Sequence, residues 1–290
     1  MINKEKLYSI GQASNKADVS TRALRHYETV GLIKPDVVKE NGYRYYTEDT
    51  ILLISIIKYL QFMDFSLYEI RDFIFNSDYD DVSKSFNELI KRTSNEIKKL
   101  DERLTIIKDW NELISEASSA FIIGNNTPSI KYIKQSELIS YPIDFSFCYE
   151  DTVLDLDFAN FVKSENNKIT GSVMFYFDSY IQRLKCEKEN RNIRCLYIQK
   201  AVKPIEDERI IFTLKDGFYG SIYHFGKYEN LSKSYEKLRE WAKKYRYKLS
   251  EDVIERFVVD SWTFRDEKKY VTEILIPIEM KVEENIWRFQ

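Results

Sequence analysis

The sequence predicts an α+β protein in three consecutive parts, and three observations support this fold class. Helix-capping residues and an Asn41-Gly42 hairpin signal divide the first part into short helices and one β hairpin. The second part, from about Asp80 to Ser118, contains no Gly or Pro and has the apolar spacing of a coiled coil. In the third part, beyond Thr127, Tyr and Phe are dense and short strands alternate with helices. The predicted domains are residues 1–77, 78–119 and 120–290.

The first two predicted helices are joined by a tight turn. One begins at Ser9, which forms a capping box with the glutamine three positions later, and ends near Lys16. Ser20 caps the second helix, and Gly31 can supply its left-handed C-terminal cap. The inward stripe of the second helix consists of Ala23, Leu24, Tyr27 and Val30. Its opposite face carries Arg22, Arg25, His26 and Thr29. This pattern is typical of a helix-turn-helix, whose second helix presents such side chains to phosphates and base edges of DNA.

A β hairpin is expected next, because Pro35 prevents a prompt return to helix. Asn41-Gly42, in which both residues can take positive φ, separates the short strands Val37-Val38 and Tyr43 to Tyr45. We interpret this hairpin as the wing of a winged helix-turn-helix. Two more helices should follow it, with N-terminal caps at Thr47 and Ser66. The core stripe of the first of these is predicted to be Ile51, Leu52, Ile54 and Leu60.

Four motifs in this region resemble the MerR family of transcriptional regulators. They are Tyr8-Ser9-Ile10-Gly11, Arg25-His26-Tyr27-Glu28, Gly31-Leu32-Ile33-Lys34-Pro35 and Gly42-Tyr43-Arg44-Tyr45-Tyr46. In that family the second helix enters the major groove and the wing grips the backbone. The resemblance therefore implies DNA-facing roles for Arg22, Arg25, Tyr27, Arg44 and Tyr45. Ser20, Thr21 and His26 of the same helix region are also predicted to bind DNA. His26 departs from the aromatic residue that is more frequent there.

Net charge does not by itself favour DNA binding. Residues 1–76 hold ten Lys or Arg and ten Asp or Glu, a difference of zero, and the whole chain carries −3. Affinity for DNA would therefore depend on where the basic groups are placed. The alternative is that these groups form only a solvated helix face. The order and spacing of the four motifs favour the DNA-binding interpretation.

The composition indicates a protein of the cytoplasm. With 43% hydrophobic and 31% charged residues, the chain suits a soluble protein with more than one packed core. No apolar stretch approaches the length of a membrane span, and the N-terminus lacks the pattern of a secretory signal. Cys148, Cys186 and Cys195 are too few and too irregular for a disulfide framework. Buried free thiols are expected, and nothing in the sequence points to a metal or another cofactor.

The long helix carries a regular stripe at alternating steps of four and three residues. It consists of Thr93, Ile97, Leu100, Leu104, Ile107, Asn111 and Ile114. Such a helix would be on the order of 55 Å long, too long to bury its stripe against one small domain. One alternative is a helix that folds back on its own chain. The resemblance instead implies antiparallel pairing with a second copy, so that a homodimer presents two recognition helices to a two-fold symmetric operator.

The third part reads as short strands and two helices. The strand candidates in its earlier half are an alternating segment from Ile143 to Tyr149, Val173 to Phe177, Ile193 to Ile198 and Ile210 to Leu214. The helix candidates are Leu156 to Ser164 and Glu229 to Tyr247, the latter with a buried stripe of Leu231, Tyr235, Leu238, Ala242 and Tyr245. The strands of the later half are Gly220 to Phe225, Ile254 to Trp262 and Tyr270 to Met280. This order is a βαββ unit, and we predict that the earlier half repeats it.

The later half also resembles the GyrI-like effector-binding domain. The motifs are Gly217-Phe218-Tyr219, His224-Phe225-Gly226, Ile254-Glu255-Arg256-Phe257 and Glu273-Ile274-Leu275-Ile276-Pro277-Ile278. The similarity covers mainly Gly217 to Met280. In that family the glutamate that follows the helix meets the ligand, which implies this role for Glu255.

Two glutamates and several aromatic residues suggest which ligand this domain binds. Strand alternation places Glu255 with Phe257, and Glu273 with Leu275, so each carboxylate would have apolar neighbours. A buried, unpaired carboxylate favours an approaching cation, and aromatic walls add about 0.5–2 kcal/mol per good cation–π contact. We therefore predict a site for a hydrophobic cation or an amphipathic molecule. The candidate ligand-binding residues are Glu255, Tyr270, Glu273, Tyr219, Phe257, Trp262 and Tyr149. The alternative is that the aromatics form only a core and that Glu255 pairs with a nearby Arg or Lys.

The sequence thus predicts a homodimeric DNA-binding regulator that senses a small molecule. The MerR resemblance implies that effector binding lets the dimer bend and untwist promoter DNA, so that RNA polymerase engages both promoter elements. Two alternatives stay open: a GyrI-like hydrolase that uses pocket Glu and Tyr side chains, and a ligand-sequestering protein. The enzyme alternative is disfavoured, because the chain has two histidines and neither a Gly-rich phosphate loop nor a nucleophile elbow.

Overall fold

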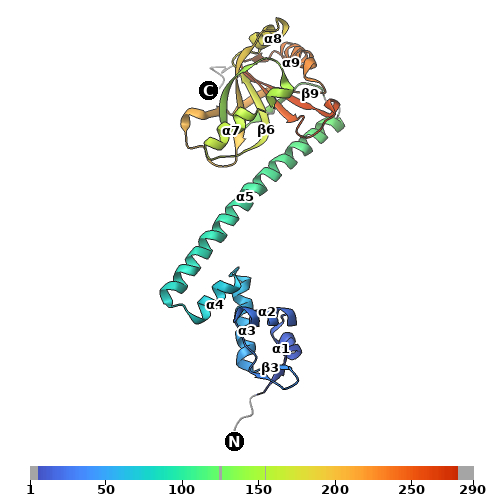
Figure 1. The fold of residues 1–290 in the computed structure, drawn as a ribbon. Coiled ribbons are helices and arrows are strands. Elements are labelled where there is room, and N and C mark those ends of the chain that lie inside the picture. Colours follow the sequence, from blue (N-terminus) through green and yellow to red (C-terminus); the bar gives the residue numbers. More distant parts are fainter. Residues whose placement is uncertain (1–5, 124–125, 154, 280–290) are drawn as a thin grey trace, which may run out of the picture. The chain divides into compact units, whose positions relative to one another are not determined.

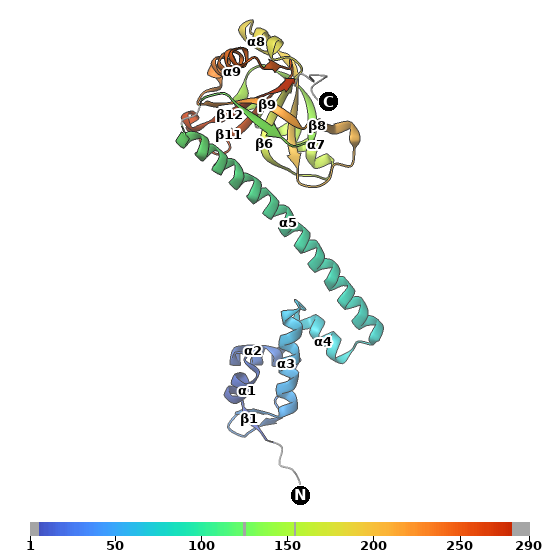
Figure 2. The same cartoon turned by 180° about the vertical axis from the view of Figure 1, so that it is seen from behind.

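The computed structural model describes residues 6–123, 126–153 and 155–279 (Figures 1 and 2). The chain divides into two compact units, Met1–Lys98 and Lys99–Gln290. Helix α5 (Tyr79–Ile123) begins in the first unit and ends in the second. The three-part division at residues 77 and 119 stays a prediction. None of the helices in the described ranges is long and apolar enough to cross a membrane.

The first unit contains four short helices and a small antiparallel sheet. The helices before α5 are α1 (Ile10–Ala17), α2 (Thr21–Val30), α3 (Glu48–Phe62) and α4 (Leu67–Phe75). The strands are β1 (Tyr8–Ser9), β2 (Val37–Val38) and β3 (Arg44–Tyr46), in the order β1-β3-β2. The predicted capping residues Ser9, Ser20, Thr47 and Ser66 each accept a backbone N–H bond at the start of their helix. Gly31 ends α2 with φ 79°. The predicted winged helix-turn-helix is therefore confirmed.

Two details of the first unit differ from the prediction. Only Gly42 of the expected two-residue turn has positive φ, at 79°. The Lys39 N–H donates to the Tyr43 carbonyl at 3.0 Å, and the Gly42 N–H donates to the Lys39 carbonyl at 2.8 Å. The hairpin thus closes through a three-residue loop that places the glycine in the left-handed position. Leu52, predicted in the core stripe of α3, is 57% exposed, because the buried stripe runs through Ile51, Ile54, Ile57 and Leu60.

The second unit is built on one large antiparallel sheet. Its strands are β4 (Ser129–Ile133), β5 (Ser136–Phe145), β6 (Ile169–Phe177), β7 (Ile193–Ala201), β8 (Ile211–Leu214), β9 (Gly217–Phe225), β10 (Lys248–Leu249), β11 (Val253–Val259) and β12 (Val271–Glu279). The helices after α5 are α6 (Tyr149–Val153), α7 (Leu156–Ser164), α8 (Tyr180–Lys188) and α9 (Leu231–Tyr245). Short 3-10 helices occupy Glu208–Ile210, Tyr228–Asn230 and Glu267–Lys269.

The strand order confirms the predicted duplication. The path is β4-β9-β12-β11-β6-β7-β5-β8, and β10 pairs with β12. In the unit β9-α9-β11-β12 the last strand lies between the other two, and in the unit β5-α7-β6-β7 it does so as well. Strands β11 and β6, each the second strand of its unit in the sequence, pair with each other and join the two units. Helix α8 is an insertion between β6 and β7, whereas β11 and β12 are connected by a segment with only the short 3-10 helix Glu267–Lys269.

Several predicted elements of the second unit are wrong in detail. Tyr149 was expected on a strand but begins α6, because β5 ends at Phe145. Helix α8 was not predicted. Of the three cysteines that were expected to be buried, Cys195 is buried, Cys186 is half-buried and Cys148 is exposed. Tyr245 is 55% exposed at the end of α9, outside the buried stripe. Strand β11 ends before Trp262, and Met280, the expected end of the last strand, lies outside the described residues, as do two residues of the predicted loop at Gly124-Asn125.

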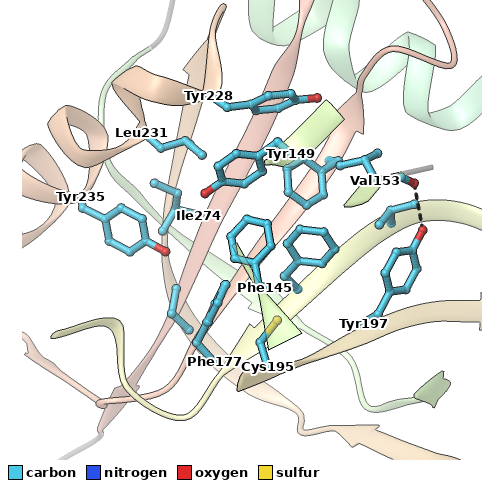
Figure 3. Close-up of a cluster of buried hydrophobic side chains, with 14 of the residues drawn as sticks. Phe145, Tyr149, Val153, Phe177, Cys195, Tyr197, Tyr228, Leu231, Tyr235 and Ile274 are labelled. Atoms are coloured by element: carbon cyan, nitrogen blue, oxygen red, sulfur yellow. Dashed lines mark hydrogen bonds between the residues drawn. The ribbon is translucent and has the colours of Figure 1, made fainter. Parts of the chain in front are cut away.

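The sheet buries different side chains on its two faces. One face holds the largest apolar cluster, which includes Phe175, Phe257 and Ile274 and is covered by α9 (Figure 3). The opposite face carries Ile254 and Leu275 in another cluster. Helices α8 and α9 lie next to each other in both views (Figures 1 and 2).

Helix α5 has two apolar faces, of which the sequence prediction recognised one. Leu113 and Ala117 are buried and pack against Val258, Val259 and Val271 of the sheet. The apolar members of the predicted coiled-coil stripe are 38–57% exposed in the single chain; they are Ile97, Leu100, Leu104, Ile107 and Ile114. The C-terminal end of the helix therefore packs on its own domain while the stripe stays available for a second helix.

Candidate DNA-binding and effector sites

Helix α2 presents a polar face that is free of the core. Thr21, Arg22, Arg25 and His26 are exposed, as the helix periodicity predicts. Ser20 precedes them, and its hydroxyl accepts the Ala23 N–H at 3.1 Å. These side chains form an exposed surface at the positions that the sequence predicts to face DNA, and contact with DNA stays a prediction.

Tyr27 does not share this face. Its ring is 4% exposed within the core of the first unit, and its hydroxyl donates to Gln61 Oε1 at 2.5 Å. A role as a DNA-facing side chain is therefore not supported. The helix periodicity already placed Tyr27 inward, whereas the family resemblance implied the contact.

The wing is tied to the recognition helix through Glu28. Arg44 Nε donates to Glu28 Oε2 at 2.9 Å, and the Tyr46 hydroxyl donates to the other oxygen of the same carboxylate. Arg44 keeps 43% of its side chain exposed, so it can still reach a phosphate. Tyr45 lies beside it, with Lys39 Nζ 4.4 Å from its ring centroid. The Glu28 contacts therefore fix the position of the wing relative to α2.

Glu255 lies at the centre of the apolar face of the sheet. It is fully buried on β11 and accepts three hydrogen bonds. Arg183 Nε donates at 2.7 Å, the Tyr235 hydroxyl at 2.8 Å and the Tyr149 hydroxyl at 3.0 Å. The expectation of an unpaired carboxylate is thus wrong, and the alternative of pairing with an arginine is correct. Figure 3 shows the hydroxyl ends of Tyr149 and Tyr235 directed toward the same space.

Arg183 is the least expected member of this group. Its side chain is fully buried on α8 and also donates to Glu187 and to the Tyr149 hydroxyl. The guanidinium carbon lies 5.2 Å from the ring centroids of both Phe147 and Tyr235. Burial alone would lower the pKa of Arg183, but the Glu255 carboxylate and the surrounding groups raise it well above its ordinary value. The cation is therefore permanent.

A pocket of about 980 Å³ opens above this buried group. Its aromatic wall includes Tyr149, Tyr228 and Tyr270, whose rings stack successively at 4.8 and 5.3 Å between centroids. Among the described residues, four carboxylates and three basic side chains line the pocket, a formal sum of 3 − 4 = −1. They are Glu187, Glu229, Glu236, Glu267, Lys188, Lys227 and Arg239. The arrangement can hold an aromatic or amphipathic molecule with a cationic group.

Only part of the predicted ligand-binding set lies together. Tyr149, Phe257 and Tyr270 belong to the same buried cluster as the apolar neighbours of Glu255. Glu273 pairs across the strands with Arg256, the residue after Glu255, and therefore lies on the opposite face of the sheet. Tyr219 is part of the cluster on that opposite face. Trp262 is 67% exposed beyond the end of β11.

Glu273 instead belongs to a second buried charge network that reaches α5. It accepts hydrogen bonds from Ser221 at 2.6 Å, Lys131 at 2.9 Å and Arg256 Nε at 2.8 Å. Arg256 also donates to Glu116 of α5, which accepts the Tyr223 hydroxyl at 2.5 Å. Burial tends to raise the pKa of Glu116, but Arg256 and Lys131 lower it overall. Glu255 and Arg256 are adjacent on β11, so one strand carries both networks.

Arg183 was not predicted as a site residue. Ser179 caps α8 and accepts the Gln182 N–H at 3.3 Å, a signal that could have identified the helix. The contact itself joins residues 72 positions apart in the chain, and no local pattern encodes such a pairing. Tyr235 was predicted only as a core residue of its helix, although it also binds the carboxylate.

A second pocket, of about 500 Å³, lies beside α5 within the same unit. Trp110, Leu156 and Trp262 are among its lining residues, together with the buried carboxylate of Asp260. Asp260 Oδ1 accepts the Trp262 N–H at 2.9 Å, but burial raises the pKa of Asp260 to about 6.

This raised pKa leads to a testable pH dependence. Below about pH 4 the Asp260 carboxyl is protonated in both the folded and the unfolded chain, so its ionisation does not reduce the free energy of unfolding. As pH rises through about 6, the folded state must bury an anion, and about 3 kcal/mol of stability is lost. Asp260→Asn keeps the acceptor for Trp262, so it should raise the free energy of unfolding at pH 7.5 by about 1–3 kcal/mol. Urea unfolding at pH 4 and pH 7.5 measures the free energy of unfolding of both proteins. The increase in Asp260→Asn should be absent at pH 4. As a control, Asp266→Asn, at an exposed position nearby, should show no pH-dependent increase.

Comparison with known proteins relates each of the two units to a family model. Residues 8–75 match the family model described as MerR HTH family regulatory protein. Residues 162–279 match the model described as GyrI-like small molecule binding domain. The HTH-type transcriptional regulator YyaN of Bacillus subtilis (strain 168) is 33% identical over 105 residues, which are 33% of this chain and 76% of the relative. The chain belongs to the MerR family. It is a DNA-binding transcriptional regulator with a GyrI-like small-molecule-binding domain.

Other relatives extend the similarity of this MerR-family chain. The Multidrug-efflux transporter 2 regulator of B. subtilis (strain 168) is 23% identical over 303 residues, which are 95% of this chain and 97% of the relative. The Multidrug-efflux transporter 1 regulator of the same organism is 41% identical over 69 residues, covering 23% of this chain and 25% of that protein. Among solved structures, the EcmrR–DNA complex aligns with a TM-score of 0.46 at 20% identity, over 94% of this chain and 99% of that chain.

Proposed function

We propose that this MerR-family regulator acts as a homodimer and senses a hydrophobic or amphipathic cation in the pocket above Glu255. The observation that carries the proposal is the buried Glu255 carboxylate beneath a wall of stacked tyrosines. Carboxylates within aromatic walls attract cations both by charge and by the ring quadrupole. Two B. subtilis relatives regulate multidrug-efflux transporters, which supports an effector of this class.

The DNA-binding part of the proposal rests on the exposed face of α2 and the wing. Arg22, Arg25 and Arg44 are exposed and would contact the DNA backbone and base edges, together with Thr21, His26 and Tyr45. The exposed stripe of α5 would pair two chains and so present two recognition helices to a two-fold operator. Distortion of the promoter DNA by such a dimer would cost a deformation energy of order 1–10 kcal/mol. Effector binding would change this distortion so that RNA polymerase engages the promoter. We place this activity in the cytoplasm, where the DNA is.

Strand β11 offers a physical connection between effector and dimer. Glu255 accepts a hydrogen bond from Tyr149 of the pocket wall, while the next residue, Arg256, bonds Glu116 on α5. An effector that interacts with Glu255 could shift strand β11. Arg256 would move with the strand, and the end of α5 that is bonded to Arg256 would move as well. This connection supports effector control of the geometry in which the dimer holds DNA.

Binding measurements with a matched pair of ligands test the effector class. We expect tetraphenylphosphonium to bind the full chain about tenfold or more tighter than neutral triphenylphosphine oxide. Glu255→Gln should remove most of this preference, whereas Glu236→Gln, on the exposed rim of the pocket, should retain it. Isothermal calorimetry gives both affinities. If Glu255→Gln loses affinity equally for the cation and for the neutral ligand, the carboxylate has a structural role.

Footprinting then separates regulation from the alternatives. A duplex selected from a random library by the wild-type chain is footprinted with and without tetraphenylphosphonium. A regulator should change the cleavage pattern at the centre of the site when the cation binds. A ligand-sequestering protein would bind the cation and leave the cleavage pattern unchanged. A hydrolase would hydrolyse a bound ester and also leave the cleavage pattern unchanged.

A further inference from the structure

The Arg183 side chain is bound as a small flat cation would be bound by a receptor. Its nitrogens donate to Glu255, Glu187 and the Tyr149 hydroxyl. Two aromatic rings, of Phe147 and Tyr235, lie 5.2 Å from the guanidinium carbon. Carboxylates in the plane and aromatic faces around it are what a guanidinium selects. The chain thus contains a cation site that its own side chain fills.

The helix that carries Arg183 is suited to leave this site. Helix α8 is an insertion of nine residues into the duplicated architecture, so no strand pairing depends on it. Its first residue donates its backbone N–H to the Glu251 carbonyl at 2.8 Å, and its outer face includes Ile181, which is 53% exposed. Leu184, Glu187 and Lys188 of the same helix line the effector pocket. A ligand in the pocket is therefore in contact with the element that holds the arginine.

We propose that Arg183 is a tethered ligand: it occupies the cation subsite beside Glu255, and a cationic effector binds by exchanging with its guanidinium. The proposal rests on the proposed function and defines its ligand class. Flat, delocalised cations, such as guanidinium or amidinium groups attached to an apolar body, fit a site shaped by a guanidinium. Compact ammonium groups cannot reproduce three planar hydrogen bonds between two rings.

The charges explain why exchange is possible and why an empty site is unfavourable. Glu255, Glu187 and Arg183 sum to −1 − 1 + 1 = −1 in the wild-type chain. Without the arginine the sum is −2, and among the described residues the fully buried Glu255 keeps as donors the hydroxyls of Tyr149 and Tyr235. A buried carboxylate without a cation is strongly disfavoured. The site therefore takes up whichever cation is available, and a free cation must compete with one held at high effective concentration by the chain.

Chemical rescue of Arg183→Ala tests this inference in the full-length protein. We expect the variant to bind benzamidinium about tenfold or more tighter than wild type by calorimetry, because the tethered competitor is gone. Millimolar ethylguanidinium should raise the thermal unfolding midpoint of Arg183→Ala by several degrees and leave wild type unchanged, relative to NaCl of equal ionic strength. Arg194→Ala is the matched control, because Arg194 is an exposed arginine of β7 that does not line the effector pocket. It should show neither effect.

Two more variants keep the test decisive. Arg183→Lys retains the charge and should fold even where Arg183→Ala does not; its benzamidinium affinity should exceed that of wild type, because an ammonium fills the planar site poorly. Adding Glu255→Gln to either variant should abolish the gain. Equal or weaker benzamidinium binding in both Arg183 variants would overturn the tethered ligand.

The outcomes also separate this inference from the proposed function. If tetraphenylphosphonium changes the wild-type footprint but the Arg183 variants gain no affinity, sensing stands and the tethered ligand fails. If the variants gain affinity but no cation changes the wild-type footprint, the tethered ligand stands and the sensing function fails.

Discussion

Replacing both Arg22 and Arg25 with Ala should reduce affinity for a selected operator by about 30-fold to 10⁴-fold. Each good arginine contact to a base or phosphate contributes about 1–3 kcal/mol, so two contribute about 2–6 kcal/mol. Both side chains are exposed on α2 and lie outside the core of the first unit. Their loss should therefore change the free energy of unfolding by no more than about 0.5 kcal/mol. Fluorescence anisotropy with labelled duplex over a range of salt concentrations measures affinity and salt slope together.

The control for this prediction removes the same charge elsewhere. Lys233 and Lys237 are exposed on α9 in the second unit, and Lys233→Ala/Lys237→Ala should bind DNA as wild type does. Sedimentation velocity should show the same oligomeric state for all three proteins. Unchanged operator affinity in the arginine variant would exclude α2 as the recognition helix. Arg44→Ala is less informative alone, because Arg44 also positions the wing through Glu28.

Arg256→Met should destabilise the second unit by about 3–5 kcal/mol, the largest effect on stability that we expect. Arg256 links Glu273, which is fully buried, to Glu116 of α5. Its removal leaves two carboxylates with Lys131 as their shared cation, so negative charge is buried without compensation. Arg239→Met, an exposed arginine on α9, should be within about 0.5 kcal/mol of wild type.

Tryptophan fluorescence makes the measurement specific for this unit. The sequence of the first unit, residues 1–98, contains no tryptophan, whereas Trp110, Trp241 and Trp262 are described residues of the second unit. Urea unfolding followed by tryptophan emission therefore does not report on the first unit. Adding Glu273→Leu to Arg256→Met should recover part of the loss, because an uncharged side chain no longer needs a partner. A single variant as stable as wild type would mean that water, and not Arg256, solvates the network.

The first unit shows how much local sequence can predict. Ser9, Ser20 and Ser66 were recognised as caps because a capping residue and its partner lie within three positions of each other. Gly31 and Pro35 likewise act on their immediate neighbours. The long helix and the βαββ order followed from periodicity and from breaks in it, which are also local properties. The inserted helix α8 was missed although Ser179 offered a similar capping signal.

The effector site shows what only the tertiary structure decided. The sequence selected Glu255 and predicted aromatic neighbours, and it left open whether the carboxylate was free or paired. Pairing with Arg183 brings together an inserted helix and a strand of the other repeat, so no period or spacing along the chain encodes it. The same holds for Glu273, which alternation placed among apolar neighbours and the folded sheet placed in a charge network on its other face. Secondary structure follows from interactions between near neighbours, whereas the partner of a buried charge is set by which distant elements the fold brings into contact.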